Sequence, residues 1–226
     1  MSDHGTAVAP PGGATRSETL TGNADVPFPE FAAPPAEPMG LLSAWLEGAV
    51  EHGVREPRAL ALATADAQGR TSSRIVAVTR VTAGGIVFIT HSDSRKGREL
   101  ASNPWASGVL YWRETTQQIT FAGPVGRLSD TEAESLWSAR AVFTHAMTTA
   151  SRQSAPLEDL EHFARLRARA LELGEPQRPL PRPATFAGYR LEPDTVEFWG
   201  NGTDRLHERL VYERTGDGWE ISRLQP

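Results

Sequence analysis

The sequence predicts a mainly β domain with peripheral helices, and three observations indicate it. Short runs with strand character recur along the chain, and turns rich in glycine or polar residues separate them, as in an antiparallel meander. Segments with helical periodicity lie before or between groups of these runs. The chain has 226 residues and 39% apolar content, which is enough to bury one core. One folded domain is therefore expected.

The N-terminal part of the chain is expected to be a disordered tail over 1–26, followed by the folded domain over 27–226. Residues 1–36 contain six prolines and four glycines among Ser, Thr and Ala, a mixture that cannot bury enough surface to offset the entropy of ordering. Leu42, Leu46 and Ala49 then recur at helical spacing and predict one amphipathic helix.

The remaining elements follow in order along the domain. Ser129-Asp130-Thr131-Glu132 is a capping-box pattern that starts a helix. Two further helices are expected: a short basic one over 94–102 and a longer one over 156–173. The longer helix and the helix begun at Ser129 should cover a β-barrel. An extended, proline-rich connector is expected over 174–188. Strands are expected at 59–65, 71–81, 86–90, 106–112, 117–128, 189–191, 195–199, 206–214 and 219–224.

Composition limits the function classes. Lys and Arg number 23 against 28 Asp and Glu, a net charge of −5, so no global basic field recruits nucleic acid or an anionic membrane. The chain has no cysteine, which excludes disulfides, thiolate catalysis and Cys-ligated metals and fits a reducing compartment. No apolar run is long enough for a membrane span, and no metal site is predicted. A cytoplasmic location is the simplest expectation.

Three basic residues, Arg205, His207 and Arg209, lie two apart in a stretch that is expected to be a strand. On a strand they would share one face about 6 to 7 Å apart, while Leu206 and Leu210 would face the core. Three such groups repel one another unless an anion or a polarised ring lies against them or the face is in water. A solvated edge strand is the simpler interpretation of the pattern alone.

The residues around this basic row resemble a known family. Phe198-Trp199-Gly200-Asn201-Gly202 precedes the row, and the chain ends Trp219-Glu220-Ile221-Ser222-Arg223-Leu224-Gln225-Pro226. Both resemble the pyridoxamine 5'-phosphate oxidase family of FMN-dependent split-barrel flavoproteins. Together with two further segments, 27–31 and 103–108, they look most like the branch that oxidises precursors in phenazine biosynthesis. The resemblance implies an FMN-binding split β-barrel that forms an obligate homodimer.

The resemblance also assigns a cofactor site. Ser94-Arg95-Lys96-Gly97 begins a short helix, where backbone N–H groups and basic side chains favour a phosphate, although such a cluster alone is more often a solvated helix start. Gln153 and Ser154 are implied to reach FMN held mainly by the other subunit. The implied cofactor-binding residues are Arg74, Ile75, Val76, Ala77, Ile89, Thr90, Arg95, Lys96, Gln118, Gln153, Ser154, Trp199 and Arg209.

Arg140 is the first substrate-site candidate, because it shares the predicted face of the helix begun at Ser129 with Leu136 and Trp137. A guanidinium on such a face must extend to solvent or find an anion. The resemblance adds Thr144, Arg205 and His207 to the substrate site, with Arg205 and His207 as the catalytic residues. The vitamin B6 oxidases of the family usually bind their substrate's phosphate with a lysine and a tyrosine where this chain has Thr79 and Leu136. Pyridoxamine phosphate is therefore expected to bind poorly.

The function that the resemblance implies is an FMN-dependent oxidase acting on a reduced phenazine carboxylate. A hydride would pass to flavin N5 and the electrons on to O2, with H2O2 as product and an aromatic ring as the outcome. Arg205 would hold a substrate carboxylate and His207 would move a proton, while Arg209 would lie near flavin N1 and Trp199 beside the ring. Two alternatives stay open: a pyridoxamine or pyridoxine 5'-phosphate oxidase, and a non-catalytic flavin-binding split-barrel protein.

Overall fold

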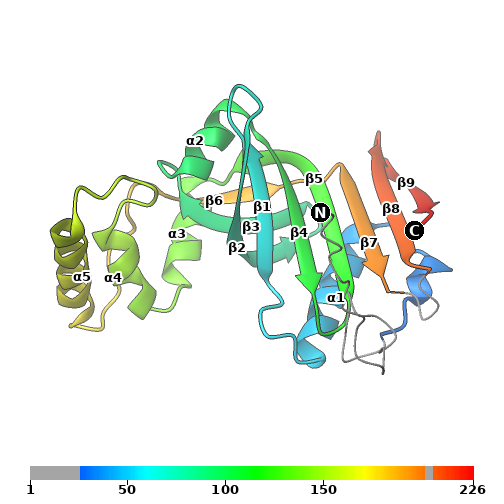
Figure 1. Ribbon diagram of the computed structural model, residues 1–226, viewed down its shortest axis with the longest axis horizontal. Helices are drawn as coiled ribbons and strands as arrows, with labels where there is room; N and C mark the ends of the chain where they lie inside the picture. The colour runs from blue at the N-terminus through cyan, green and yellow to red at the C-terminus, as the bar shows by residue number, and fades with distance from the viewer. Residues whose placement is uncertain (1–25, 202–205) are drawn as a thin grey trace, which may run out of the picture.

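The computed structural model describes residues 26–201 and 206–226, and its centre is a closed β-barrel (Figure 1). Six strands follow one another around the barrel in the order β4, β1, β2, β3, β6, β5, and pairing of β4 with β5 closes it. Strands β7, β8 and β9 continue the sheet from β5. The strands are β1 Ala59–Ala65, β2 Thr71–Thr82, β3 Gly85–His91, β4 Trp105–Trp112, β5 Gln117–Arg127, β6 Phe186–Leu191, β7 Thr195–Gly200, β8 Glu208–Thr215 and β9 Gly218–Leu224. The predicted split-barrel class is confirmed.

The core forms because alternate side chains of the strands turn inward. In β1, Leu60 and Leu62 are fully buried, and the intervening residues are partly exposed. Helix α1, Pro38–Glu51, packs its apolar stripe onto this core. Trp45 lies 4.7 Å from Phe28 and 5.2 Å from Phe198 between ring centroids, in edge-on contacts. The N-terminal segment, α1 and the C-terminal strands thus share one core.

Two helices begin with side-chain caps, and the sequence predicted one of these caps, the capping box at Ser129. Helix α2, Arg95–Ser102, starts at Ser94, whose Oγ accepts a hydrogen bond from the Gly97 amide. Helix α3, Asp130–Ser138, starts with the complete capping box of Ser129 and Glu132. These caps fix where the polypeptide leaves the barrel and turns into each helix.

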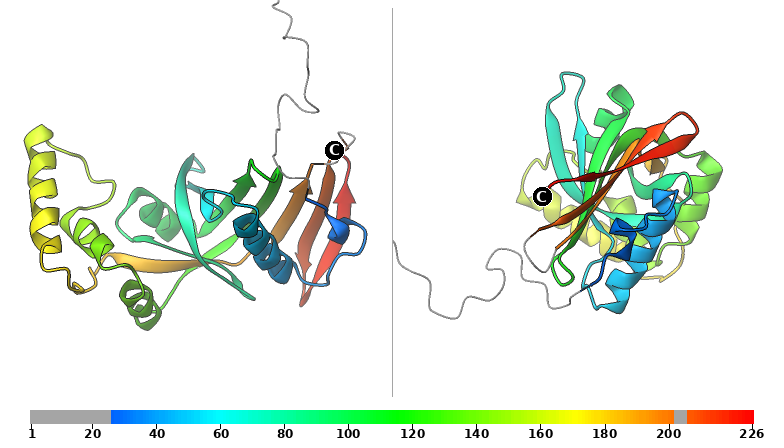
Figure 2. Two further views of the ribbon diagram at one scale, coloured as in Figure 1. Left: turned by 90° about the horizontal axis from the view of Figure 1, so that it is seen from below. Right: turned by 90° about the vertical axis from the view of Figure 1, so that its right-hand side faces the viewer.

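A pair of helices forms an arm at one end of the molecule. Helix α4, Phe143–Ala150, was not predicted, and α5, Leu160–Gly174, packs against it. The expectation that this second helix covers the barrel is wrong, because α5 has no buried residue and lies farther from the barrel than α4 (Figures 1 and 2). The strands β7–β9 lie at the opposite end of the molecule (Figure 2).

Several other expectations need correction. Strand β8 begins at Glu208, so His207 precedes the strand, and Leu206 is 62% exposed instead of buried. Strand β6 begins at Phe186, inside the predicted connector. Arg140 follows the end of α3 and does not lie on the helix. In the described parts of the chain, none of the helices has the length and apolar character needed to cross a membrane. The predicted tail falls almost wholly outside the described residues.

Candidate functional site

A polar cavity of about 460 Å³ lies between β2, the end of β3, the start of α2 and the segment that follows α4. Its lining contains ten of the thirteen residues that the resemblance assigned to the cofactor, together with Ser72 and Ser73. Those ten are Arg74, Ile75, Val76, Ala77, Ile89, Thr90, Arg95, Lys96, Gln153 and Ser154. Residues far apart in the sequence therefore meet at one place.

The close approach of α2 to the strand end requires glycine at position 97. A Cβ at Gly97 would lie 2.4 Å from the carbonyl oxygen of Ser92 and 2.5 Å from that of His91. The first turn of α2 therefore packs directly on the backbone that follows β3. This contact brings the amide groups and the basic side chains of the helix start to the cavity, an arrangement that suits an anion.

Lys96 is a buried cationic residue of the cavity. Its side chain is buried, and Nζ donates to Thr90 Oγ1 at 3.0 Å and to Gln153 Oε1 at 3.1 Å. No carboxylate lies within 4.0 Å of Nζ among the described residues. Burial lowers the pKa of Lys96, and the positive charge of Arg74 lowers it further. A buried ammonium held only by neutral oxygens is suited to a bound anion.

The two arginines of the cavity share one carboxylate, Glu99, which the sequence analysis missed. Glu99 meets Arg74 Nη2 at 3.2 Å and Arg95 Nε at 2.9 Å. Burial opposes ionisation of Glu99, but hydrogen bonds from two hydroxyls and these two arginines outweigh it and lower its pKa to about 2. The spacing of Arg95 and Glu99, four residues apart on a helix, was the signal in the sequence.

Gln153 and Ser154 line the cavity of their own chain. The resemblance placed them at a cofactor held mainly by the other subunit, whereas the structure places Gln153 Oε1 at 2.9 Å from Thr90 Oγ1 of the same protomer. Ser154 has a left-handed backbone conformation, with φ of 66°. Arg152, next to the pair, contacts Asp93 at 3.6 Å between Nε and Oδ2. These contacts hold the segment against the end of β3 and the start of α2.

The other predicted residues form a second cluster, which we call the hairpin cluster: Gln118, Trp199, His207 and Arg209. Gln118 pairs with Trp199, and Trp199 with Arg209, across neighbouring strands β5, β7 and β8. The rings of Trp199 and His207 lie 4.6 Å apart, and Nδ1 of His207 is buried with no hydrogen-bond partner among the described residues. The hairpin cluster does not line the cavity. Arg205 lies outside the described residues.

The two predicted substrate residues of the helical region have different contacts. The Arg140 guanidinium lies 5.5 Å from the Trp137 ring centroid and 5.4 Å from that of Phe186. Burial lowers its pKa, and it has no ion pair among the described residues. Thr144 instead donates its hydroxyl to the Ala141 carbonyl at 2.7 Å. Arg140 therefore remains able to bind an anion, whereas Thr144 is engaged with the backbone.

Thr79 and Leu136, where the resemblance leads us to expect a lysine and a tyrosine in B6 oxidases, have different surroundings. Thr79 is exposed at a β-bulge, where Val78 pairs with Phe88 but Arg80 pairs with Val87. Bulges commonly redirect a side chain next to a site. Leu136 is 8% exposed and packs in a small apolar cluster with Trp137 and Phe186.

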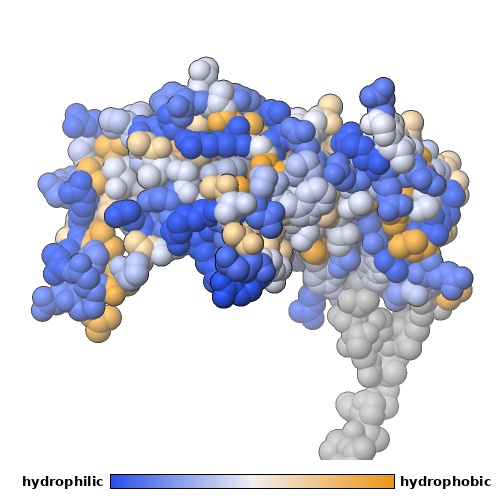
Figure 3. Space-filling model, turned by 90° about the horizontal axis from the view of Figure 1, so that it is seen from above, coloured by the Kyte–Doolittle hydropathy of each residue, from blue (hydrophilic) through white to orange (hydrophobic). Residues whose placement is uncertain are grey.

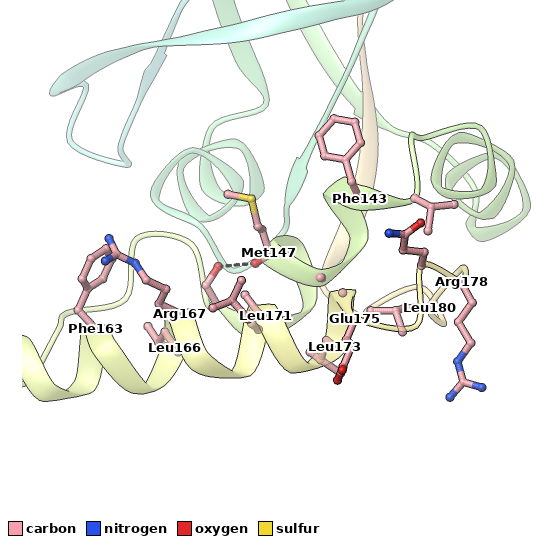
Figure 4. A pocket seen from close by; sticks show the side chains of 17 residues that line it. Phe143, Met147, Phe163, Leu166, Arg167, Leu171, Leu173, Glu175, Arg178 and Leu180 are labelled. Carbon is pink, nitrogen blue, oxygen red and sulfur yellow. Dashed lines mark hydrogen bonds between the residues drawn. The ribbon is translucent and has the colours of Figure 1, made fainter.

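A larger groove of about 1090 Å³ lies along α4, α5 and the connector that follows them, and its lining is mostly apolar. In Figure 4, Phe143 and Met147 rise from α4 on the side opposite α5. These two side chains are 77% and 67% exposed. The groove lacks the converging polar groups that chemistry requires, so we place the candidate site in the smaller cavity.

Comparison with protein families gives two matches. Residues 46–200 match the family described as pyridoxamine 5'-phosphate oxidase. Residues 186–226 match the pyridoxine 5'-phosphate oxidase C-terminal dimerisation region. The second range contains Trp199, His207 and Arg209 of the hairpin cluster.

Individual proteins are also similar over nearly the whole chain. A dihydrophenazinedicarboxylate synthase of Pseudomonas chlororaphis is 53% identical over 93% of both chains. A pyridoxine/pyridoxamine 5'-phosphate oxidase of Gluconobacter oxydans is 37% identical over 89% of this chain and 99% of the relative. Among solved structures, PhzG from Burkholderia lata in complex with tetrahydrophenazine-1-carboxylic acid has a TM-score of 0.86 and 53% identity, and covers 91% of this chain and 100% of that one.

Proposed function

This chain belongs to the pyridoxamine 5'-phosphate oxidase family of flavoenzymes, and on that premise we propose that it is an FMN-dependent oxidase that aromatises a reduced phenazine carboxylate. The observation that carries the proposal is the 53% identity to a dihydrophenazinedicarboxylate synthase over 93% of both chains. The B6 oxidases compared with it reach 37% to 41%. Thr79 and Leu136, which replace two phosphate-binding side chains of those oxidases, agree with this choice.

The cavity fits the phosphate end of FMN. Three cationic side chains, Arg74, Arg95 and Lys96, line it, and Lys96 has no carboxylate partner in the described chain. The start of α2 adds backbone N–H groups. Exposed Ile75 and Ala77 on β2 offer an apolar edge along which the rest of the cofactor can lie. These features support FMN as the flavin that the chain binds.

The chemistry that FMN would supply when bound is two-electron oxidation of the substrate, with O2 as the proposed final acceptor and H2O2 as the product. The contribution of the protein is to bind and orient the substrate. Arg140 and Arg205 are the side chains proposed to hold its carboxylate groups. His207 is proposed to take up the proton that the substrate ring loses along with the hydride, since an imidazole can act as a base. Trp199, whose ring lies tilted against that of His207, would exclude water from that side.

The two clusters are proposed to complete one site across a homodimer. The cavity holds phosphate-binding groups, whereas the hairpin cluster holds the groups expected at the flavin ring and the substrate, and the two are separate within one protomer. The hairpin residues of β7 and β8 fall in the region matched by the dimerisation model. The arm presents exposed Phe143 and Met147, and hydrophobic surface lies on its inner side beside a hollow (Figure 3). A second copy would cover that surface.

Mixing two impaired variants, at an FMN concentration too low to saturate the cavity variant, tests the shared site. Lys96→Ala removes a cavity residue, and Arg209→Ala removes a hairpin residue. If each site combines one cluster from each protomer, mixed dimers contain one intact site, and exchange of subunits should restore roughly a quarter of the sites. Activity that does not rise after subunit exchange would place both clusters in the site of one protomer and contradict the shared arrangement.

Substrate choice is tested by anaerobic reduction of the flavin, followed by stopped-flow absorbance. The wild-type protein should be reduced faster by a dihydrophenazine dicarboxylate than by pyridoxamine 5'-phosphate. Faster reduction by pyridoxamine phosphate would favour the B6 oxidase alternative. Absence of reduction by both, in a protein that binds FMN, would favour a non-catalytic flavin-binding role.

A further inference from the structure

Glu99 connects the strands with the helix that together form the cavity. Its carboxylate, in a side chain that is 7% exposed, accepts hydrogen bonds from Thr64 Oγ1 at 2.5 Å and from Ser72 Oγ at 2.7 and 2.9 Å. The same carboxylate holds Arg74 of β2 and Arg95 of α2. One buried anion therefore links two hydroxyls of the β1–β2 hairpin with two cationic side chains of the site.

The two arginines need such a common acceptor. They come from different elements, carry like charges and line the same cavity, so they repel one another when no anion lies between them. Arg95 is 61% exposed and would otherwise be free to turn into solvent. Glu99 holds it through Nε, which leaves the two Nη groups of Arg95 for a second anion.

Glu99 itself does not line the cavity, although Arg74, Arg95 and Lys96 do. Three positive charges and one negative charge leave a net charge of about +2 around the cavity, against the charge of about −1.5 to −2 on a phosphate monoester at neutral pH. The carboxylate thus contacts both arginines from outside the lining of the cavity.

We propose that Glu99 is a positioning residue that makes the cavity select a phosphorylated flavin over an unphosphorylated one. The proposal rests on the proposed function, in which the phosphate of FMN is the anion. It concerns a residue that touches neither substrate nor cofactor and acts through Arg74 and Arg95.

The sign of the effect separates positioning from charge alone. The negative charge of Glu99 by itself repels a phosphate, so a purely electrostatic role predicts that Glu99→Gln binds FMN more tightly. A positioning role predicts weaker binding, because the arginines lose their fixed orientation. Glu99→Asp keeps the charge but shortens the side chain by one methylene, so it cannot reach the hydroxyls and both arginines together. Positioning predicts a loss in this variant too.

The experiment measures the dissociation constants of FMN and riboflavin for the full-length apoprotein by quenching of flavin fluorescence. Wild type should prefer FMN. Glu99→Gln and Glu99→Asp should each lose at least about tenfold in FMN affinity, the effect of one charge-assisted hydrogen bond, with riboflavin affinity unchanged. Asp66→Asn is the control. Asp66 is a carboxylate bound to Arg70 in the turn between β1 and β2, and it does not line the cavity. The preference of this variant for FMN should equal that of wild type.

Thr64→Val provides a milder test if the Glu99 variants do not fold. Thr64 does not line the cavity, and its loss removes one donor to Glu99 and one acceptor of Arg74 Nη1, so a smaller decrease in the same direction is expected. An FMN preference that is unchanged or increased in all these variants would overturn the proposed role of Glu99 but would leave the phosphate site in place. A wild-type protein that does not distinguish FMN from riboflavin would overturn the phosphate site, and the role of Glu99 with it.

Discussion

Arg209 and Glu197 form a close ion pair across the β7–β8 hairpin, with Nε and Oε1 2.6 Å apart. The hydrogen bond from Arg209 to this carboxylate raises the pKa of the guanidinium. A second hydrogen bond joins Arg209 Nη1 to the Gln225 carbonyl at 3.2 Å. If Arg209 lies beside the flavin ring as proposed, Glu197 holds it in place and also offsets part of its positive charge.

Glu197→Gln is therefore expected to raise the midpoint potential of the bound flavin. The reduced flavin carries more negative charge than the oxidised one, so an unneutralised Arg209 stabilises it. A change on the order of 30 mV corresponds to about 1.4 kcal/mol for a two-electron couple. Spectroelectrochemical titration measures the potential, with Glu213→Gln on the exposed part of β8 as the control. A lowered potential in Glu197→Gln would contradict the placement of Arg209.

Lys96→Met should weaken FMN binding without lowering the thermal stability of the apoprotein. Burial disfavours the charge of Lys96, so its removal should leave the thermal midpoint of the apoprotein unchanged or raised. Loss of one charged contact to the phosphate, about 1.5 to 3 kcal/mol, should weaken FMN affinity roughly 10- to 100-fold. Thermal unfolding and flavin titration measure the two effects. Arg98→Met, on the exposed side of α2, is the matched control. A destabilised apoprotein with normal FMN affinity would indicate a purely structural lysine.

Thr79→Lys should increase activity with pyridoxamine 5'-phosphate. Thr79 is exposed at the bulge of β2, so a lysine can be accommodated there. One added contact of about 1.5 kcal/mol would raise kcat/KM for that substrate by up to about tenfold. Steady-state kinetics with both substrates test it, and Thr71→Lys at the far end of β2 should have no effect. The single change is preferable to one that includes Leu136→Tyr, because Leu136 Cδ1 packs against Gly188 and a larger ring would overfill the site.

Glu99 should make stability depend on pH in the acid range. Its pKa is about 2 in the folded protein, against 4.5 for an ordinary glutamate. The unfolded chain therefore binds the proton more readily, so the stabilisation is complete above about pH 4.5 and is lost as the pH falls toward 2. Urea unfolding of wild type and Glu99→Gln between about pH 6 and pH 3 should show a shrinking difference in free energy. A difference that stays constant over this range would argue against an ionised Glu99.

Most of the barrel could be predicted from the sequence because its signals are local. The β1 and β2 strands show alternation and a defined turn, and Ser129 with Glu132 forms the expected capping box. The arm could not be predicted in the same way. Its α4 lacks a side-chain cap, and α5 presents an apolar face that a single protomer leaves exposed, so its packing depends on information outside the local sequence.

The site shows a similar division. Most residues assigned to the cavity meet there because short connections fix β2, β3 and α2 relative to one another, and Gln153 joins them through hydrogen bonds with Thr90 and Lys96. Glu99 was missed because its importance comes from Thr64 and Ser72, which are distant in sequence and were unremarkable as single residues. The row of Arg205, His207 and Arg209 was assigned to one strand, but the strand begins only at Glu208.

The pairing of β5 with three other strands has a consequence for synthesis of the protein. Its hairpin with β4 is local, but Val125 pairs with Leu191 and Phe121 with Val196, which lie more than sixty residues later in the chain. A nascent chain emerging from the ribosome can therefore form the sheet of β3, β2, β1, β4 and β5 early but cannot close the barrel until β6 has emerged. Until then the edges of β3 and β5 remain open for mispairing. Cotranslational folding should thus pause at an open sheet, and closure should be among the last steps.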